Sequence, residues 1–104
     1  MWLALTNAFV SVVAETGTKN LLVRARKREH LKRIFPGHKI QETPERDYRF
    51  RTVVSRDTMA KRAAQAVYDI DYPNFKNSVK DHGLHDLYSG FWMDHNQYQH
   101  TKGL

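Results

Sequence analysis

The sequence predicts an α+β fold, in which an antiparallel sheet of three to four strands has helices packed on one face. Two segments, 20–26 and 48–54, alternate apolar with polar or charged residues, which is typical of strands buried on one side. Two later segments, 57–70 and 84–92, repeat apolar residues every three to four positions, as amphipathic helices do. With the shorter elements between them, the predicted order is β-β-α-β-β-α-α.

The first two predicted strands form a hairpin. Residues 8–14 are rich in β-branched side chains, and residues 15–19 contain a glycine, which suits a loop of about five residues. The chain then returns as the strand 20–26. Next, apolar residues recur at helical spacing within 27–35, and the Pro36–Gly37 pair should end that short helix.

Two more strands are expected after the short helix. Residues 38–42 suit a short edge strand, and residues 43–47 form a polar loop with turn residues. The strand 48–54 then places Tyr48, Phe50, Thr52 and Val54 on one face and Arg49, Arg51 and Val53 on the other. If helices cover the apolar face, the face that bears the arginines stays open to solvent or to a partner.

The longest predicted helix spans 57–70 and begins at a cap formed by Ser55 or Asp57. Pro73 ends it, because the residue before a proline is pushed out of the helical conformation. The aromatic-rich segment 84–92 should form a further helix that docks onto the core.

The length of 104 residues suits one domain, which we expect to span residues 1–93. Residues 94–104 are polar and lack an apolar period, so they are expected to form a flexible C-terminal tail.

The chain has no cysteine, which excludes a disulfide framework, a thiolate zinc site and a cysteine nucleophile. No run of about 18 apolar residues occurs, so we expect no membrane span. The absence of cysteine is compatible with a reducing cytoplasm, which is the expected location.

Positive charge is concentrated in the first part of the chain. Residues 19–62 hold 14 of the 17 Lys and Arg against five acidic residues, whereas residues 63–104 hold three Lys against five Asp. A basic half beside a mildly acidic half suggests an anionic partner for the basic half. The alternative is a charge that serves only solubility.

The strongest candidate for a binding surface is a set of four arginines at strand spacing: Arg24, Arg26, Arg49 and Arg51. Guanidinium groups bind phosphate and carboxylate groups through two parallel hydrogen bonds. Proteins that bind single-stranded nucleic acid combine such positive charges with exposed aromatic side chains on the same surface. Phe9 is the candidate for the aromatic side chain here. The alternative is a solvated face on which arginine stems cover aliphatic neighbours.

Catalytic and metal-binding patterns are weak. The histidines His82, His85, His95 and His100 do not offer three or four converging ligands, so no metal site and no cofactor are predicted. A second set, Asp69, Asp71 and Asp86 with His85, contains groups suited to acid–base chemistry or to holding a divalent metal ion. Asp69 and Asp71 lie at a predicted helix end, however, where aspartates commonly form turns.

Three parts of the chain carry a resemblance to other sequences: residues 22–26 with Leu31, residues 47–51, and residues 70–76 with His85, Tyr88 and Trp92. With these residues the chain resembles a group of short bacterial proteins to which no activity is assigned. The run from Ile70 to Lys76 is the most specific part. The resemblance implies a joint role for Asp71, Asn74, Phe75 and Lys76. The alternative is that the run pins a helix junction to the core.

The leading hypothesis is a small intracellular binding module that presents a basic sheet face to nucleic acid or to an acidic protein surface. A rival is a small hydrolase or nuclease-like enzyme that uses Asp71, His85 and nearby arginines. A third hypothesis is a phage-type or toxin–antitoxin-type inhibitor that acts by protein contact. Strong salt dependence of nucleic-acid binding would favour the first, and metal-dependent turnover the second.

Overall fold

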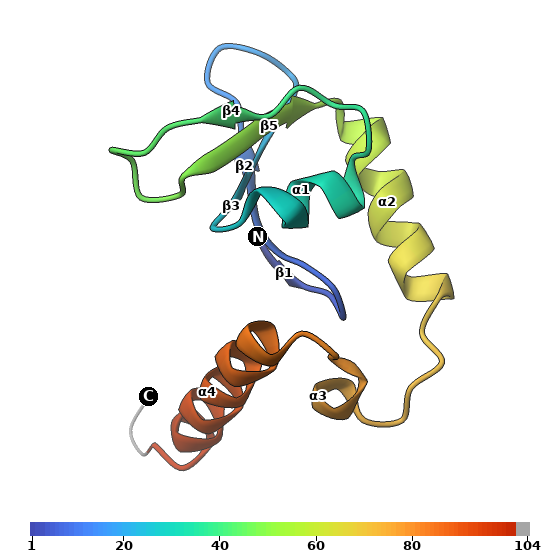
Figure 1. The fold of residues 1–104 in the computed structure, drawn as a ribbon, viewed down its shortest axis with the longest axis vertical. Coiled ribbons are helices and arrows are strands. Elements are labelled where there is room, and N and C mark those ends of the chain that lie inside the picture. The colour runs from blue at the N-terminus through green and yellow to red at the C-terminus, as the bar shows by residue number, and fades with distance from the viewer. Residues whose placement is uncertain (102–104) are drawn as a thin grey trace.

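The computed structural model describes residues 1–101 and contains a five-stranded antiparallel sheet with four helices (Figure 1). The strands lie in the order β1-β2-β3-β5-β4. Their bounds are β1 (Trp2–Ala4), β2 (Phe9–Ala14), β3 (Leu21–Ala25), β4 (Gln41–Glu42) and β5 (Phe50–Val54). The predicted α+β class and the antiparallel sheet are confirmed.

The central strand β3 divides the sheet into two distinct faces. Because side chains alternate along a strand, Val23 and Ala25 point to one face and Leu22 and Arg24 to the other. The first side, here called the core face, holds side chains that are 6% exposed or less: Val10, Val12, Val23, Ala25 and Val54. The other side, here called the open face, holds Ser11, Arg24 and Arg51.

The helix α1 (Arg28–Ile34) covers the core face. Leu31 is fully buried there, and Ile34 and Phe35 are 7% and 1% exposed. The chain leaves α1 through Phe35 and turns at Gly37, whose φ of 85° favours glycine. The short predicted helix and its stop signal are therefore both found.

The helix α2 (Arg56–Tyr68) starts as the sequence indicated, with the Ser55 hydroxyl accepting a hydrogen bond from the Thr58 N–H at 3.0 Å. Only Met59 is buried, and it joins the core beneath the sheet. Ala63 and Ala66 are half-buried, whereas Val67 and Tyr68 near the end of the helix are 64% and 84% exposed. The apolar stripe predicted for the whole helix therefore anchors its first turns only.

Three strands, β1, β4 and β5, differ from the prediction. The strand β1 was not expected, because three apolar residues are too few to show an alternating pattern. The strand β5 begins at Phe50 rather than Tyr48. The reason is a tight loop: the Thr43 N–H donates to the Arg49 carbonyl at 2.6 Å, and the Thr43 hydroxyl donates to the Tyr48 carbonyl at 3.1 Å. Likewise β4 has two residues where five were predicted.

The helices α3 (Phe75–Ser78) and α4 (His82–Gln99) lie at the β1 end of the molecule, apart from α1 (Figure 1). They form a second apolar cluster around Phe9 with Val79, Leu84 and Tyr88. Phe9 lies on the same side of β2 as Ser11, so these helices cover one corner of the open face. The prediction of helices on one face therefore holds for α1 and α2 alone.

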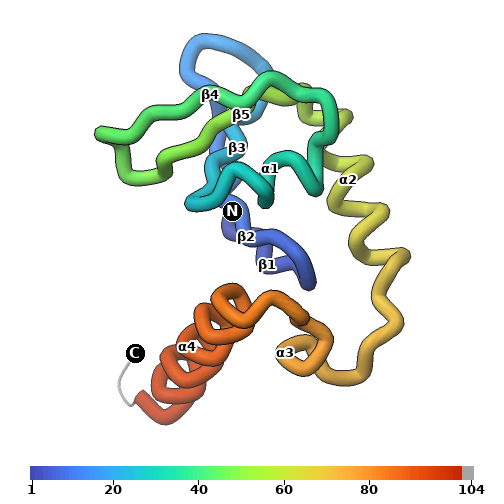
Figure 2. The backbone as a smooth tube through the Cα atoms, in the orientation of Figure 1, coloured from blue at the N-terminus to red at the C-terminus, as the bar shows by residue number. Residues whose placement is uncertain are grey.

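An extended segment, residues 69–74, carries the chain from α2 to α3 (Figure 2). It ends at Asn74, whose side chain caps α3 by accepting a hydrogen bond from the Asn77 N–H at 3.0 Å. The break predicted around Pro73 is therefore found. No helix in the described part of the chain is long and apolar enough to cross a membrane.

The predicted tail begins inside a helix, because α4 continues to Gln99. Asp81 caps α4 by accepting a hydrogen bond from the Leu84 N–H at 3.0 Å, and no proline follows to stop the helix. Residues 94–99 are thus helical rather than irregular. The remaining part of the predicted tail, residues 102–104, lies outside the described residues.

Deleting residues 94–104 should lower the melting temperature by less than about 4 °C, since about 1 kcal/mol shifts a domain of this size by roughly 4–8 °C. Between residues 94 and 101 every side chain except the half-buried Asn96 is exposed, so little apolar contact is lost. Differential scanning calorimetry of the shortened chain makes this measurement. A fall of about 8 °C or more would contradict it, because it would show that the end of α4 stabilises the domain.

Candidate functional site

One line of side chains crosses the open face from edge to edge. The strand register pairs Trp2 with Ser11, Ser11 with Arg24, Arg24 with Arg51, and Arg51 with Gln41. These five residues come from five different strands and share one face, because paired residues in antiparallel strands point the same way. We call them the cross-sheet row. It places two guanidinium groups at the centre of the face and an aromatic ring at one edge.

Arg24 is held in place but is not neutralised. Its Nη2 donates to the Ser11 hydroxyl at 2.8 Å, while its Nε is buried and has no hydrogen-bond partner within residues 1–101. None of the ion pairs in that part of the chain involves Arg24 or Arg51. A buried donor without a partner costs stability, and so does a charge that lacks a counter-ion. The site is therefore electrostatically incomplete.

Arg51 lies directly opposite Arg24 and adds to the same positive charge. Partial burial is the main reason that the pKa of the Arg51 guanidinium is held below its ordinary value. The charges of Arg46 and Arg24 lower this pKa further, and the Asp47 carboxylate opposes them. An arginine stays protonated in any case. The centre of the row is thus a concentration of positive charge that an anion would stabilise.

Tyr48 orders the arginines beside the row. Its ring is 5% exposed, and the guanidinium carbons of Arg24 and Arg26 lie 4.7 and 4.2 Å from the ring centroid. Arg26 also donates to the Asp47 carboxylate at 3.1 Å. The prediction that Tyr48 shares the apolar face with Phe50 is wrong, because the Thr43–Arg49 loop interrupts the alternation before β5 begins.

Arg49 does not lie with the other three arginines. It contacts the Glu42 carboxylate at 2.6 Å, and Arg28 of α1 contacts the same carboxylate at 3.2 Å. The hydrogen bond from Arg49 is the main reason that the Glu42 pKa is lowered. The sequence therefore placed Arg24 and Arg51 on one face correctly and Arg26 beside them. For Arg49 the prediction is wrong, since that residue precedes β5 and turns to a counter-ion.

Trp2 supplies the aromatic ring that the sequence could not place. Its side chain is 67% exposed, and its ring stacks on Phe91 of α4 with centroids 6.2 Å apart and planes at 20°. Phe9, the residue predicted for this role, is 6% exposed and belongs to the apolar cluster under α4. Trp2 faces the same side as Ser11, with which it pairs. The sequence does not indicate this, because a strand of three residues is too short to show an alternating pattern.

The run from Ile70 to Lys76 makes mainly structural contacts. The Phe75 ring packs against Tyr88 at a centroid distance of 5.0 Å, and the Lys76 ammonium lies 4.6 Å from the Trp92 ring centroid. Asn74 caps α3, as described above, and Asp71 is exposed in the extended segment. Asn74 and Lys76 also line an aromatic groove between α3 and α4 with a volume of about 490 Å³. The structure therefore does not bring Asp71 to the open face.

Replacing Phe75 by alanine should cost about 2 kcal/mol of stability, less than a fully buried aromatic, because Phe75 is half-buried at the edge of its cluster. Chemical denaturation measures this loss. The matched control is Tyr68→Ala, since Tyr68 is 84% exposed at the end of α2. A loss below about 1 kcal/mol for Phe75→Ala would instead make the run from Asp71 to Lys76 a candidate for binding.

The residues that the sequence offered for acid–base chemistry or metal binding lie on different elements of the fold. Asp69 accepts a hydrogen bond from the Gln65 side chain at 2.7 Å at the end of α2, while Asp86 and His85 lie on α4. No group of three or more His, Asp or Glu residues within residues 1–101 is arranged to hold a metal ion. These residues therefore do not form a common site with the arginines of the row.

No family model, curated protein or solved structure matches this chain. The fold and the open face define a small α+β protein whose five-stranded sheet has two arginines at the centre of its open face.

Proposed function

We propose that this chain binds single-stranded nucleic acid across the open face, with Arg24 and Arg51 contacting backbone phosphates and Trp2 stacking on a base. The observation that carries the proposal is the cross-sheet row, in which an exposed aromatic ring lies in one line with two arginines that have no ion-pair partner among residues 1–101. Proteins that bind single strands combine these two elements on an open surface.

The arginines suit a phosphate ligand. A guanidinium carries five N–H donors, and the structure shows one hydrogen bond from Arg24, to the Ser11 hydroxyl. A phosphate between Arg24 and Arg51 would accept hydrogen bonds from both and would relieve the repulsion between them. Tyr48 favours this arrangement, because its buried ring holds Arg24 in place before any ligand arrives.

Trp2 suits a base. Phe91 supports one side of the indole ring, so most of the ring remains available while its position is fixed. Stacking of a base on an aromatic side chain contributes roughly 1–3 kcal/mol. Neighbouring strands lie about 4.8 Å apart, so Trp2 on β1 and Arg24 on β3 are separated by roughly 10 Å across the sheet. A nucleic-acid strand running across the β-strands can reach both.

Fluorescence anisotropy with a labelled single-stranded oligonucleotide of about ten nucleotides tests the proposal, since binding sites of this kind cover about 4–16 nucleotides. Binding by the unaltered chain should weaken steeply as salt is raised. Trp2→Ala should reduce the affinity by about 5- to 100-fold, because it removes one stacked base. The matched control is Trp92→Ala, since Trp92 is 46% exposed on α4 and lies outside the row.

Three results would overturn the proposal: no binding at low salt, binding that is independent of salt, or equal losses for Trp2→Ala and Trp92→Ala. An acidic protein surface would use the same arginines without needing Trp2. If a polyglutamate peptide binds and the oligonucleotide does not, the ligand is an acidic polypeptide and the proposal is wrong.

A further inference from the structure

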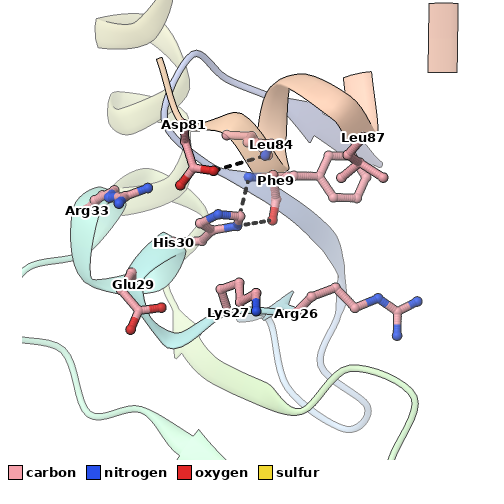
Figure 3. A pocket seen from close by; sticks show the side chains of 10 residues that line it. Phe9, Arg26, Lys27, Glu29, His30, Arg33, Asp81, Leu84 and Leu87 are labelled. Atoms are coloured by element: carbon pink, nitrogen blue, oxygen red, sulfur yellow. Dashed lines mark hydrogen bonds between the residues drawn. The ribbon is translucent and has the colours of Figure 1, made fainter. Parts of the chain in front are cut away.

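A cavity of about 440 Å³ lies between the start of α1 and the start of α4 (Figure 3). Arg26 connects it to the open face, because Arg26 both lines the cavity and stacks on Tyr48 beside Arg24. Its volume falls within the usual range of small-molecule sites, about 300–1,000 Å³. The cavity is thus large enough for one nucleotide and opens beside the proposed path of the strand.

One wall of the cavity is apolar. Phe9 and Leu84 are 6% and 5% exposed, so they form a fixed surface, and Leu87 continues that surface with 40% of its side chain exposed. Figure 3 shows Leu84 and Leu87 on α4 beside Phe9. An apolar wall of this kind suits the flat face of an aromatic ring.

A donor and an acceptor lie at the edge of this wall, because His30 contacts the Phe9 backbone and Asp81 accepts a hydrogen bond from the Leu84 N–H. The His30 Nδ1 lies 3.2 Å from the Phe9 backbone nitrogen and 3.4 Å from the Phe9 carbonyl oxygen. We take the shorter contact, in which Nδ1 accepts from the N–H, as the hydrogen bond, and this assigns the proton of the neutral ring to Nε2. Burial is the main reason that the His30 pKa is lowered, which keeps the ring neutral near pH 7. Asp81 lies near His30, as Figure 3 shows, and its pKa is lowered chiefly by the hydrogen bond from the Leu84 N–H. Its carboxylate is therefore an ionised acceptor.

Positive groups surround the opening. Lys27, Arg26 and Arg33 line the cavity, and the ion pairs within residues 1–101 leave Lys27 without a carboxylate partner. Arg33 donates to the Asn7 carbonyl at 2.6 Å, which fixes its position. A ligand with an aromatic body, a donor–acceptor edge and a phosphate would meet each part of this lining.

We propose that the cavity receives one nucleotide of the bound strand, with the flat face of its base against the apolar wall, the edge of the base at His30 and Asp81, and its phosphate at Lys27. This inference rests on the proposed function. Asp81 accepts best from an exocyclic amino group, and His30 donates to a ring nitrogen beside it. Adenine and cytosine offer that pair of groups, whereas uracil has no amino group. The cavity should therefore prefer adenine or cytosine.

Titration of the full chain with adenosine monophosphate, followed by amide chemical shifts, tests this inference. The Phe9 amide, which donates to His30, should shift. Uridine monophosphate should bind more weakly, and Lys27→Gln should weaken adenosine monophosphate by about tenfold, since it removes a hydrogen bond from a charged group. The matched control is Lys32→Gln, because Lys32 is exposed on α1 outside the cavity.

Asp81→Asn is the test of base preference. Asparagine also caps helices, so α4 should remain folded, but its amide replaces an acceptor that carries full charge. The preference for adenosine over uridine monophosphate should shrink. Equal binding of both by the unaltered chain, or equal losses for Lys27→Gln and Lys32→Gln, would overturn the inference.

Two further outcomes separate this inference from the proposed function. If oligonucleotides bind with Trp2 dependence but adenosine monophosphate leaves the Phe9 amide unchanged at millimolar concentration, the cavity is not a nucleotide site and the function of the face stands. If the mononucleotide binds but oligonucleotides do not, the cavity has no part in binding a strand, and both proposals are wrong.

Discussion

Replacing Tyr88 by alanine should lower the free energy of unfolding by about 3–5 kcal/mol, the loss typical of a buried aromatic residue. Tyr88 is 3% exposed, and its ring lies 5.0 Å from that of Phe75 and 6.1 Å from that of Phe91. Its hydroxyl lies 2.8 Å from the carbonyl oxygens of Leu5 and Ala8, in the turn between β1 and β2. Tyr88 therefore fastens α4 to the sheet.

Chemical denaturation separates the two contributions of Tyr88. Tyr88→Phe keeps the ring and removes only the hydroxyl, so it should cost about 1–2 kcal/mol. Tyr98→Ala is the control, because Tyr98 is 68% exposed near the end of the same helix and should change stability by less than about 0.5 kcal/mol. A loss below about 1 kcal/mol for Tyr88→Ala would mean that α4 is not needed to stabilise the sheet.

Replacing Arg24 and Arg51 together by glutamine should reduce the affinity for a single-stranded oligonucleotide by at least roughly 100-fold at low salt. A hydrogen bond to a charged group contributes about 1.5–3 kcal/mol, and two such contacts would be lost. The dependence on salt should also become shallower, by about 0.7 in the logarithmic slope for each phosphate contact removed. Anisotropy titrations over a range of salt concentrations measure both changes.

The control for that pair is Lys61→Gln with Arg62→Gln, which removes the same charge from exposed positions on α2. If the two double variants lose affinity equally, the effect reflects net charge rather than the open face. The melting temperature of the Arg24 and Arg51 variant should fall only slightly, because the lost hydrogen bond to Ser11 and the lost contact with the Tyr48 ring are offset by relief of the repulsion between the two charges. Its two arginines have no carboxylate partners within residues 1–101, so replacing them breaks no ion pair there.

The elements that the sequence predicted well carry their own local signals. Alternation in β3 placed Arg24 on the face opposite Val23, and the cap at Ser55 set the start of α2. The elements that it missed depend on distant contacts or on loop geometry. Three residues of β1 show no period, and the tight Thr43–Arg49 loop moves Tyr48 and Arg49 out of the pattern that continues in β5.

The candidate site was predictable to a similar extent. Two of its charges follow from strand spacing, because Arg24 and Arg51 lie within regular strands. The role of Trp2 does not follow from strand spacing, since its ring is positioned by stacking on Phe91 of α4, which is far away in the sequence. The cavity beside it was also beyond prediction, because the His30 ring is fixed by the backbone of Phe9, which no periodicity in α1 indicates.

The most direct test of the open face is the map of amide chemical shifts of the labelled protein with a single-stranded oligonucleotide. The largest changes should fall on Ser11, Arg24 and Arg51 and on the indole N–H of Trp2, with little change along α2. Changes that gather on α2 or on the groove between α3 and α4, with the cross-sheet row unaffected, would contradict the assignment of this face as the binding surface.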